Sequence, residues 1–171
     1  MSAHLQIPIS ITSSRPRREA IFETAAEREL VQPLAVRSSA AFSAASSRLF
    51  YAFTIPEYIE TWLTAPDADD VRCSGNPAAG VPLSIELRQN RRVSASIFAD
   101  YTNITAQDLN VRWYLRSRTQ TSVTQLRIAI RIVRADTLLR IRHTGFINPA
   151  EWSWHQDLWG FSLTKMQMVI R

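Results

Sequence analysis

Two histidines, His143 and His155, are the residues of this sequence best suited to acid–base chemistry. Histidine changes its charge near neutral pH, and catalysis also needs an orienting partner and a substrate within reach. His143 belongs to a run of alternating side chains and His155 to the helical pattern that follows, so the two can converge. The alternative is a hydrogen-bonded core histidine that joins strand to helix. An enzyme of the cyclase or hydrolase type, using His143 or His155, is therefore one open interpretation.

Other catalytic and ligating patterns are missing from the sequence. No serine stands in a Gly-x-Ser-x-Gly motif, and the single cysteine, Cys73, lies in a turn-rich segment far from any histidine. Three histidines and one cysteine show no metal-ligand spacing, and four glycines supply no phosphate-binding loop. We expect no catalytic nucleophile, no metal and no cofactor.

A strand near the end of the chain is expected to position His143. The residues from Thr137 to Phe146 alternate strictly, and alternate side chains of a strand share a face. One face carries Thr137, Leu139, Ile141 and His143, and the other carries Arg140 and Arg142. Arg134-Ala135-Asp136 marks the turn that leads into this strand.

A long C-terminal helix is expected to position His155. Asn148 provides an N-cap, Pro149 a first-turn proline and Glu151 a carboxylate at the third helical position. One stripe of the helix then carries Trp152, His155, Trp159, Leu163, Met166 and Ile170. Trp154 is expected to face outward.

The preceding elements predict an α+β fold. A strand over 34–42 is followed by a short helix capped by Ser43 and by a second helix with a capping box at Thr54, whose inward residues include Tyr58 and which ends before Pro66. Residues 67–82 are rich in turn formers. Alternating runs at 83–87, 93–97, 109–115 and 126–132 predict antiparallel strands with one apolar face.

Composition and charge place the chain among soluble globular proteins. It has 171 residues, 46% of them hydrophobic, and no apolar run approaches the roughly 20 residues of a membrane span. One cysteine fits a reducing compartment, so we expect a cytoplasmic location. We expect a loosely ordered extension over 1–33 and one domain over 34–171.

Arginines dominate the second half of the chain. Between Leu109 and Arg142 stand eight arginines and one acidic residue, Asp136. Such a face could bind an acidic protein partner. Nucleic acid is disfavoured, because Tyr114 is the only clear stacking aromatic among those arginines.

Several of these residues resemble a known family. The run Thr137-x-Leu139-x-Ile141-x-His143-Thr144-Gly145-Phe146, followed by Trp152, His155 and Trp159, resembles the C-terminal signature of the SRPBCC superfamily, in its branch named for the activator of the heat-shock-protein-ninety ATPase (Aha1-like). Two further elements resemble that branch, namely Ile55-Pro56-Glu57 with Trp62-Leu63, and Arg112-Trp113. The resemblance covers 34–171, although the usual glycine-rich stretch after the tryptophan helix is reduced here.

The resemblance implies a helix-grip fold like that of START lipid carriers and pathogenesis-related allergens. In it a curved antiparallel sheet wraps around a long C-terminal helix and leaves an apolar tunnel. We expect the tunnel to bind a small apolar or amphipathic ligand, as a carrier, a sensor or a stress-related binding protein. The expected ligand-binding residues are Trp113, Thr137, Leu139, Ile141, His143, Trp152, His155, Trp159, Leu163 and Met166. A cavity filled by side chains leaves the same pattern.

A second interpretation assigns the function to the outer face of the sheet. The arginines there could make the domain a protein-interaction or co-chaperone-like module. Ligand identity and oligomeric state leave no mark in the sequence.

Overall fold

The computed structural model describes residues 34–170, which belong to one compact unit. The predicted extension over 1–33 lies outside the described residues, as does Arg171. The elements in chain order are β1 (Ala35–Phe42), α2 (Ser46–Thr54), α3 (Pro56–Trp62), β2 (Asp70–Asn76), a short 3-10 helix (Pro77–Ala79), β3 (Val81–Gln89), β4 (Arg92–Ile104), β5 (Asp108–Ser117), β6 (Thr121–Val133), β7 (Asp136–Thr144) and α4 (Pro149–Val169).

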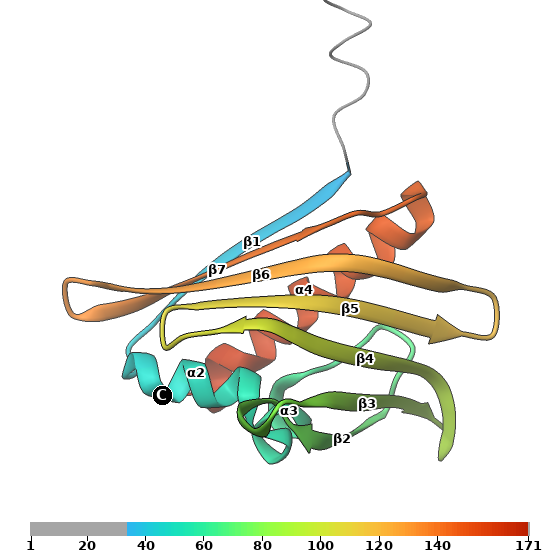
Figure 1. Cartoon of the computed structure of the whole chain (residues 1–171), viewed down its shortest axis with the longest axis horizontal. Coiled ribbons are helices and arrows are strands. Elements are labelled where there is room, and N and C mark those ends of the chain that lie inside the picture. The colour runs from blue at the N-terminus through green and yellow to red at the C-terminus, as the bar shows by residue number, and fades with distance from the viewer. Residues whose placement is uncertain (1–33, 171) are drawn as a thin grey trace, which may run out of the picture. The chain divides into compact units, whose positions relative to one another are not determined.

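The strands form one antiparallel sheet in the order β1-β7-β6-β5-β4-β3-β2. β1 pairs with β7, so segments from opposite ends of the described chain lie side by side. Figure 1 shows α4 running along one face of the curved sheet, with α2 and α3 at the end of that face; α2 contacts α3 and β6, and α3 packs against β2. The predicted α+β helix-grip fold is therefore confirmed.

The alternation in β7 separates a buried face from a wet one, as predicted. Leu139, Ile141 and His143 are buried, whereas Arg140 and Arg142 are exposed. The same rule holds along β6, except that Ile132 is 71% exposed near the turn into β7. Because only one face is covered by helices, the other is free to carry charge.

α4 begins as the sequence predicts. The side chain of Asn148 accepts a hydrogen bond from the backbone nitrogen of Glu151 at 2.8 Å, and Pro149 occupies the first turn. The Glu151 carboxylate accepts in return from the backbone nitrogen of Ile147 at 3.2 Å. This reciprocal cap holds Glu151 against the loop from β7.

The two short helices start differently from prediction. Ser43 does not cap α2; its hydroxyl donates to Asp136 at 3.0 Å, and the cap residue, Ala45, makes no side-chain bond. Thr54 does not cap α3 either, because its hydroxyl donates back to the carbonyl of Phe50 at 2.9 Å. Such bonds to the preceding turn compete with capping. α3 ends at Trp62, and Tyr58, predicted to point inward, is 51% exposed.

The turn-rich segment 67–82 contains a strand that the sequence analysis missed. β2 pairs with β3 through a bulge at Gly75, whose φ is +124°. A Cβ on Gly75 would lie 2.3 Å from the carbonyl oxygen of Pro82, so the bulge requires glycine. The glycines and prolines that signal turns therefore also build a bulged strand.

Candidate functional site

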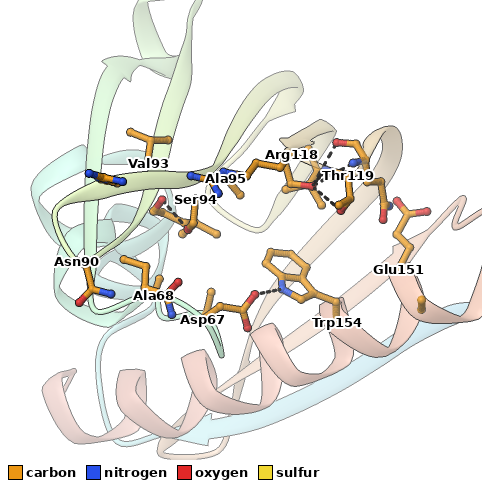
Figure 2. A pocket seen from close by; sticks show the side chains of 18 residues that line it. Asp67, Ala68, Asn90, Val93, Ser94, Ala95, Arg118, Thr119, Glu151 and Trp154 are labelled. Carbon is orange, nitrogen blue, oxygen red and sulfur yellow. Dashed lines mark hydrogen bonds between the residues drawn. The ribbon is translucent and has the colours of Figure 1, made fainter.

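A cavity of about 690 Å³ lies at one end of the sheet. Four segments surround it (Figure 2): the β3–β4 hairpin, the β5–β6 hairpin, the loop from α3 to β2, and the first turns of α4. We call it the hairpin cavity. Its apolar lining is Ala65, Ala68, Leu87, Val93, Ala95, Leu115, Ala150 and Trp154, and its polar lining is Asp67, Gln89, Asn90, Arg92, Ser94, Ser117, Arg118, Thr119, Gln120 and Glu151.

The polar groups of this cavity are graded by depth. Arg92 and Arg118 are exposed at its rim, whereas Glu151 is only 2% exposed. The apolar side chains Leu87, Ala95 and Leu115, which the sheet contributes to the lining, are also buried. The cavity is therefore amphipathic, with an apolar wall, a basic rim and a buried carboxylate.

Trp154 forms part of the wall, which corrects the prediction that it faces outward. Its indole nitrogen donates to Asp67 at 3.4 Å, and Figure 2 shows the ring across the cavity from Ser94 and Ala95. The outward assignment failed because the β5–β6 hairpin and the loop from α3 to β2 extend beyond the core and enclose a second side of α4.

The residues predicted from sequence to bind ligand lie elsewhere, in the packed interior. None of them lines the hairpin cavity. Trp113 and Trp159 line an interior void of about 20 Å³, room for about one water molecule. The core around them includes Leu139, Ile141, Leu163 and Met166. Their contact with a ligand stays a prediction.

Two of the predicted residues make structural hydrogen bonds. The hydroxyl of Thr137 donates to the carbonyl of Ala44 at 2.7 Å, and the indole nitrogen of Trp152 donates to the carbonyl of Ala35 at 3.1 Å. Both bonds therefore tie β7 and α4 to the chain at the two ends of β1.

His143 is held by hydrogen bonds at both ring nitrogens. Nδ1 accepts from the indole nitrogen of Trp159 at 3.1 Å, and Nε2 lies 2.7 Å from the hydroxyl of Thr124. Because an indole N–H can only donate, Nδ1 must be unprotonated and Nε2 carries the hydrogen. Thr124 in turn donates to the carbonyl of Trp113 at 3.3 Å. The network joins β5, β6, β7 and α4 through one neutral tautomer.

His155 lies next to this network. The two imidazole centroids are 4.6 Å apart, so the predicted convergence of the histidines is present. Nδ1 of His155 lies 2.9 Å from the carbonyl of Glu151 and donates to it, whereas Nε2 is buried without a partner. Phe146 and Trp154 pack against the ring at centroid distances of 5.0 and 4.8 Å. An aromatic cluster therefore connects the core to the hairpin cavity.

Burial keeps both histidines neutral. Desolvation, and secondly the neighbouring His155, hold the pKa of His143 well below its ordinary value of 6.5. Desolvation also lowers the pKa of His155, and the hydrogen bond and charge of Glu151 oppose that shift. With both nitrogens engaged, His143 has the geometry of a structural histidine rather than a general base.

Within residues 34–170 the structure gives no support for a reactive cysteine, a metal site or a membrane-spanning helix. Burial raises the pKa of the Cys73 thiol to about 12, with Glu60 and Glu57 adding to the shift, so the reactive thiolate is scarce at neutral pH. No group of three or more histidine, cysteine or acidic side chains is placed to hold a metal ion. None of the helices combines the length and hydropathy that a bilayer crossing requires.

A row of arginines crosses the outer face of the sheet. Arg37, Arg142 and Arg127 are directly opposite one another on β1, β7 and β6, and adjacent strands are about 4.8 Å apart. With Arg140 they line a groove of about 310 Å³. Within the described part of the chain only Arg127 of these four has a carboxylate partner, Asp108 at 3.5 Å.

Two other arginines, one on β5 and one on β6, are paired with carboxylates. Arg112 pairs with Asp100, and Arg131 lies 2.8 Å from Asp108. Like charges directly opposite on neighbouring strands are destabilising unless something neutralises them. The row of directly opposed arginines is therefore a local feature of the β1-β7-β6 edge and does not extend over the whole outer face.

Comparison with known proteins finds similarity in structure alone. No family model matches the sequence, and no curated protein matches it. Among solved structures, a protein from Chromobacterium violaceum superposes with a TM-score of 0.66 at 15% identity, over 81% of this chain and 98% of that one. The Aha1 dimer from Colwellia psychrerythraea gives 0.60 at 16% identity, over 80% and 95%. CalU16 from Micromonospora echinospora gives 0.58 at 16%, over 78% and 74%.

These similarities decide the fold. This chain has the same fold as the Aha1 dimer from Colwellia psychrerythraea and as CalU16. The resemblance seen in its sequence is thereby confirmed at the level of fold. In this domain the interior beneath the sheet is filled, and an open amphipathic cavity lies at the end of the sheet.

Proposed function

We propose that this Aha1-like domain reversibly binds a small amphipathic molecule in the hairpin cavity. The observation that carries the proposal is the cavity itself: its volume of about 690 Å³ lies within the range of roughly 300–1,000 Å³ for small-molecule sites. Its wall combines apolar side chains, which would supply affinity, with polar side chains, which would supply orientation.

The affinity would come mainly from desolvation of apolar ligand surface. Removing such surface from water is worth about 25 cal/mol per Å². Leu87, Ala95 and Leu115 offer the apolar surface on the sheet, and the Trp154 ring offers it on α4. The polar groups at the rim and at Glu151 would then fix how the ligand lies.

Filling the cavity is expected to abolish binding. The Ala95→Phe substitution projects a ring into the hairpin cavity, and we expect affinity for a naphthalene-type probe to fall at least tenfold, in proportion to the apolar contact it displaces. Isothermal titration calorimetry measures this. Ala129→Phe, on the outer face of β6, is the matched control and should bind as the wild type does. Unchanged affinity in Ala95→Phe would contradict the proposal.

A ligand site at the sequence-predicted residues is the alternative location. A ligand there requires the rings of Trp113 and Trp159 to separate, because about 20 Å³ is open between the residues around them. Binding that survives Ala95→Phe and is lost in Trp159→Phe would favour that interior site.

A second candidate function rests on the arginine row. Three aligned cationic side chains, two of them without a carboxylate partner in the described chain, fit an acidic protein segment. This use of the outer face is independent of the cavity, and the two functions can coexist.

Charge reversal is expected to separate the two functions. Arg142→Glu places a carboxylate at the centre of the row and should weaken binding to a deca-glutamate peptide about tenfold at low salt. Arg112→Glu, which alters an arginine already paired with Asp100, is the control. Fluorescence anisotropy at increasing salt measures both. Equal weakening in the two variants would indicate net charge alone and would contradict a specific surface.

A further inference from the structure

Apart from His143 and His155, Glu151 is the only acidic or basic side chain that is buried among the described residues. It is 2% exposed. It projects from the first turn of α4 into the wall of the hairpin cavity, on the same side as Arg118 and Thr119 (Figure 2). Its Oε2 accepts from the backbone nitrogen of Ile147 at 3.2 Å, but its Oε1 is buried without a partner. The capping of α4 therefore explains the position of Oε2, but it gives Oε1 no partner.

A second buried polar atom without a partner lines the same cavity. The amide nitrogen Nε2 of Gln120, which follows Thr119 in the β5–β6 hairpin, makes no hydrogen bond in the described chain. Buried polar groups are nearly always hydrogen-bonded, and each one left unpaired costs about 1–3 kcal/mol. Two of them at one cavity are better explained by a binding function than by packing.

The chemistry of the two atoms restricts which ligand group could pair with both. A carboxylate oxygen only accepts hydrogen bonds, and an amide nitrogen only donates them. A hydroxyl group donates and accepts, so it can satisfy both atoms. An ammonium group has no acceptor for Gln120. A carboxylate has no donor for Glu151 and would bring two like charges together in a buried site.

We propose that Glu151 and Gln120 form a subsite for the hydroxyl group of the ligand, which is an alcohol or a phenol with an apolar body. This inference rests on the proposed function, because it names the ligand class of the hairpin cavity. The apolar body lies along Leu87, Ala95 and Leu115, and the hydroxyl lies at the Glu151 end. The arginines at the rim, Arg92 and Arg118, are exposed and contribute little to selection between head groups.

The test compares three probes of one shape: 2-naphthol, 2-naphthoate and naphthalene. Calorimetry on the full chain at neutral pH is expected to give 2-naphthol an affinity at least tenfold above both others, since a site built for a hydroxyl rejects analogues that lack it. In Glu151→Gln the affinity for 2-naphthol should exceed that for 2-naphthoate by only about twofold, because the repulsion between the two carboxylates disappears. This variant keeps a carbonyl oxygen for Ile147, and its thermal midpoint checks its folding.

Asp157→Asn is the matched control. Asp157 is an exposed residue of α4 that does not line the cavity, so its neutralisation changes the net charge equally and should leave the preference for 2-naphthol unchanged. Binding of all three probes with equal affinity, or tighter binding of 2-naphthoate, would overturn the hydroxyl subsite while leaving the cavity as a binding site. Failure of all three probes to bind would overturn the proposed function and the subsite with it.

Discussion

Replacement of His143 by alanine is expected to lower the free energy of unfolding by about 3 kcal/mol. The ring is completely buried, and it contacts Trp113, Phe146, His155 and Trp159 at centroid distances of 4.6–6.1 Å. The substitution opens a cavity among these rings. It also leaves the Trp159 indole N–H without its acceptor in the buried interior. Urea unfolding followed by tryptophan fluorescence measures the loss.

A double-mutant cycle isolates the hydrogen bond within that loss. Trp159→Phe removes the indole N–H, so His143→Ala in that background no longer strands a buried donor. The cost of His143→Ala should therefore be smaller there by about 1 kcal/mol. Arg140→Ala, on the exposed face of the same strand, should change stability by less than about 0.5 kcal/mol. A cost for His143→Ala as small as this control would show that the histidine does not join β7 to α4.

The alternation of side chains made much of this fold predictable. In β7 a period of two places Leu139 inside and Arg140 outside, and the antiparallel register of the sheet preserves that rule from strand to strand. The Asn148 cap likewise set the start of α4, because a side-chain oxygen three residues before a carboxylate is a local signal. A local signal was not sufficient by itself, because the caps predicted at Ser43 and Thr54 rest on the same kind of pattern and did not form.

The site was harder to predict, because its walls come from segments distant in sequence. Gln120, Asp67 and Glu151 line one cavity only because the β5–β6 hairpin, the loop from α3 to β2 and the start of α4 come together. Alternation shows which face of a strand is apolar. It does not show at which end of the sheet a cavity stays open, or which side chains fill the rest of the interior. The same limit explains Trp154, whose partner Asp67 lies 87 residues earlier in the chain.

The tautomer of His143 was also beyond sequence analysis. His143 could be expected to face the interior, but only the Trp159 indole decides that Nδ1 accepts, and only Thr124 gives Nε2 its partner. A histidine with both nitrogens engaged and one with a free nitrogen leave the same pattern of alternation. The choice between a structural and a catalytic histidine therefore depends on three-dimensional contacts.

Acidification from pH 6.5 to pH 5 is expected to destabilise the protein by about 1.4 kcal/mol per pH unit for each histidine that stays neutral when folded. The pKa of His143 is held well below 6.5 by burial and by His155, and burial also lowers the pKa of His155. In the unfolded chain both histidines take up protons below 6.5. The unfolded state then binds more protons, so the free energy of unfolding rises with pH through this window and levels off above it.

Comparison with His143→Gln assigns the acid sensitivity to this residue. Glutamine keeps an amide and takes up no proton, so the dependence of unfolding free energy on pH between 5 and 6.5 should lose the contribution of one group. The carboxylates titrate alike in both proteins, and the difference between the two urea-unfolding series cancels them. An identical slope in the variant would mean that the folded state protonates His143 near its ordinary pKa, which the Trp159 N–H at Nδ1 opposes. Such a histidine would again be a candidate acid or base, so the same measurement tests the structural role against the catalytic one.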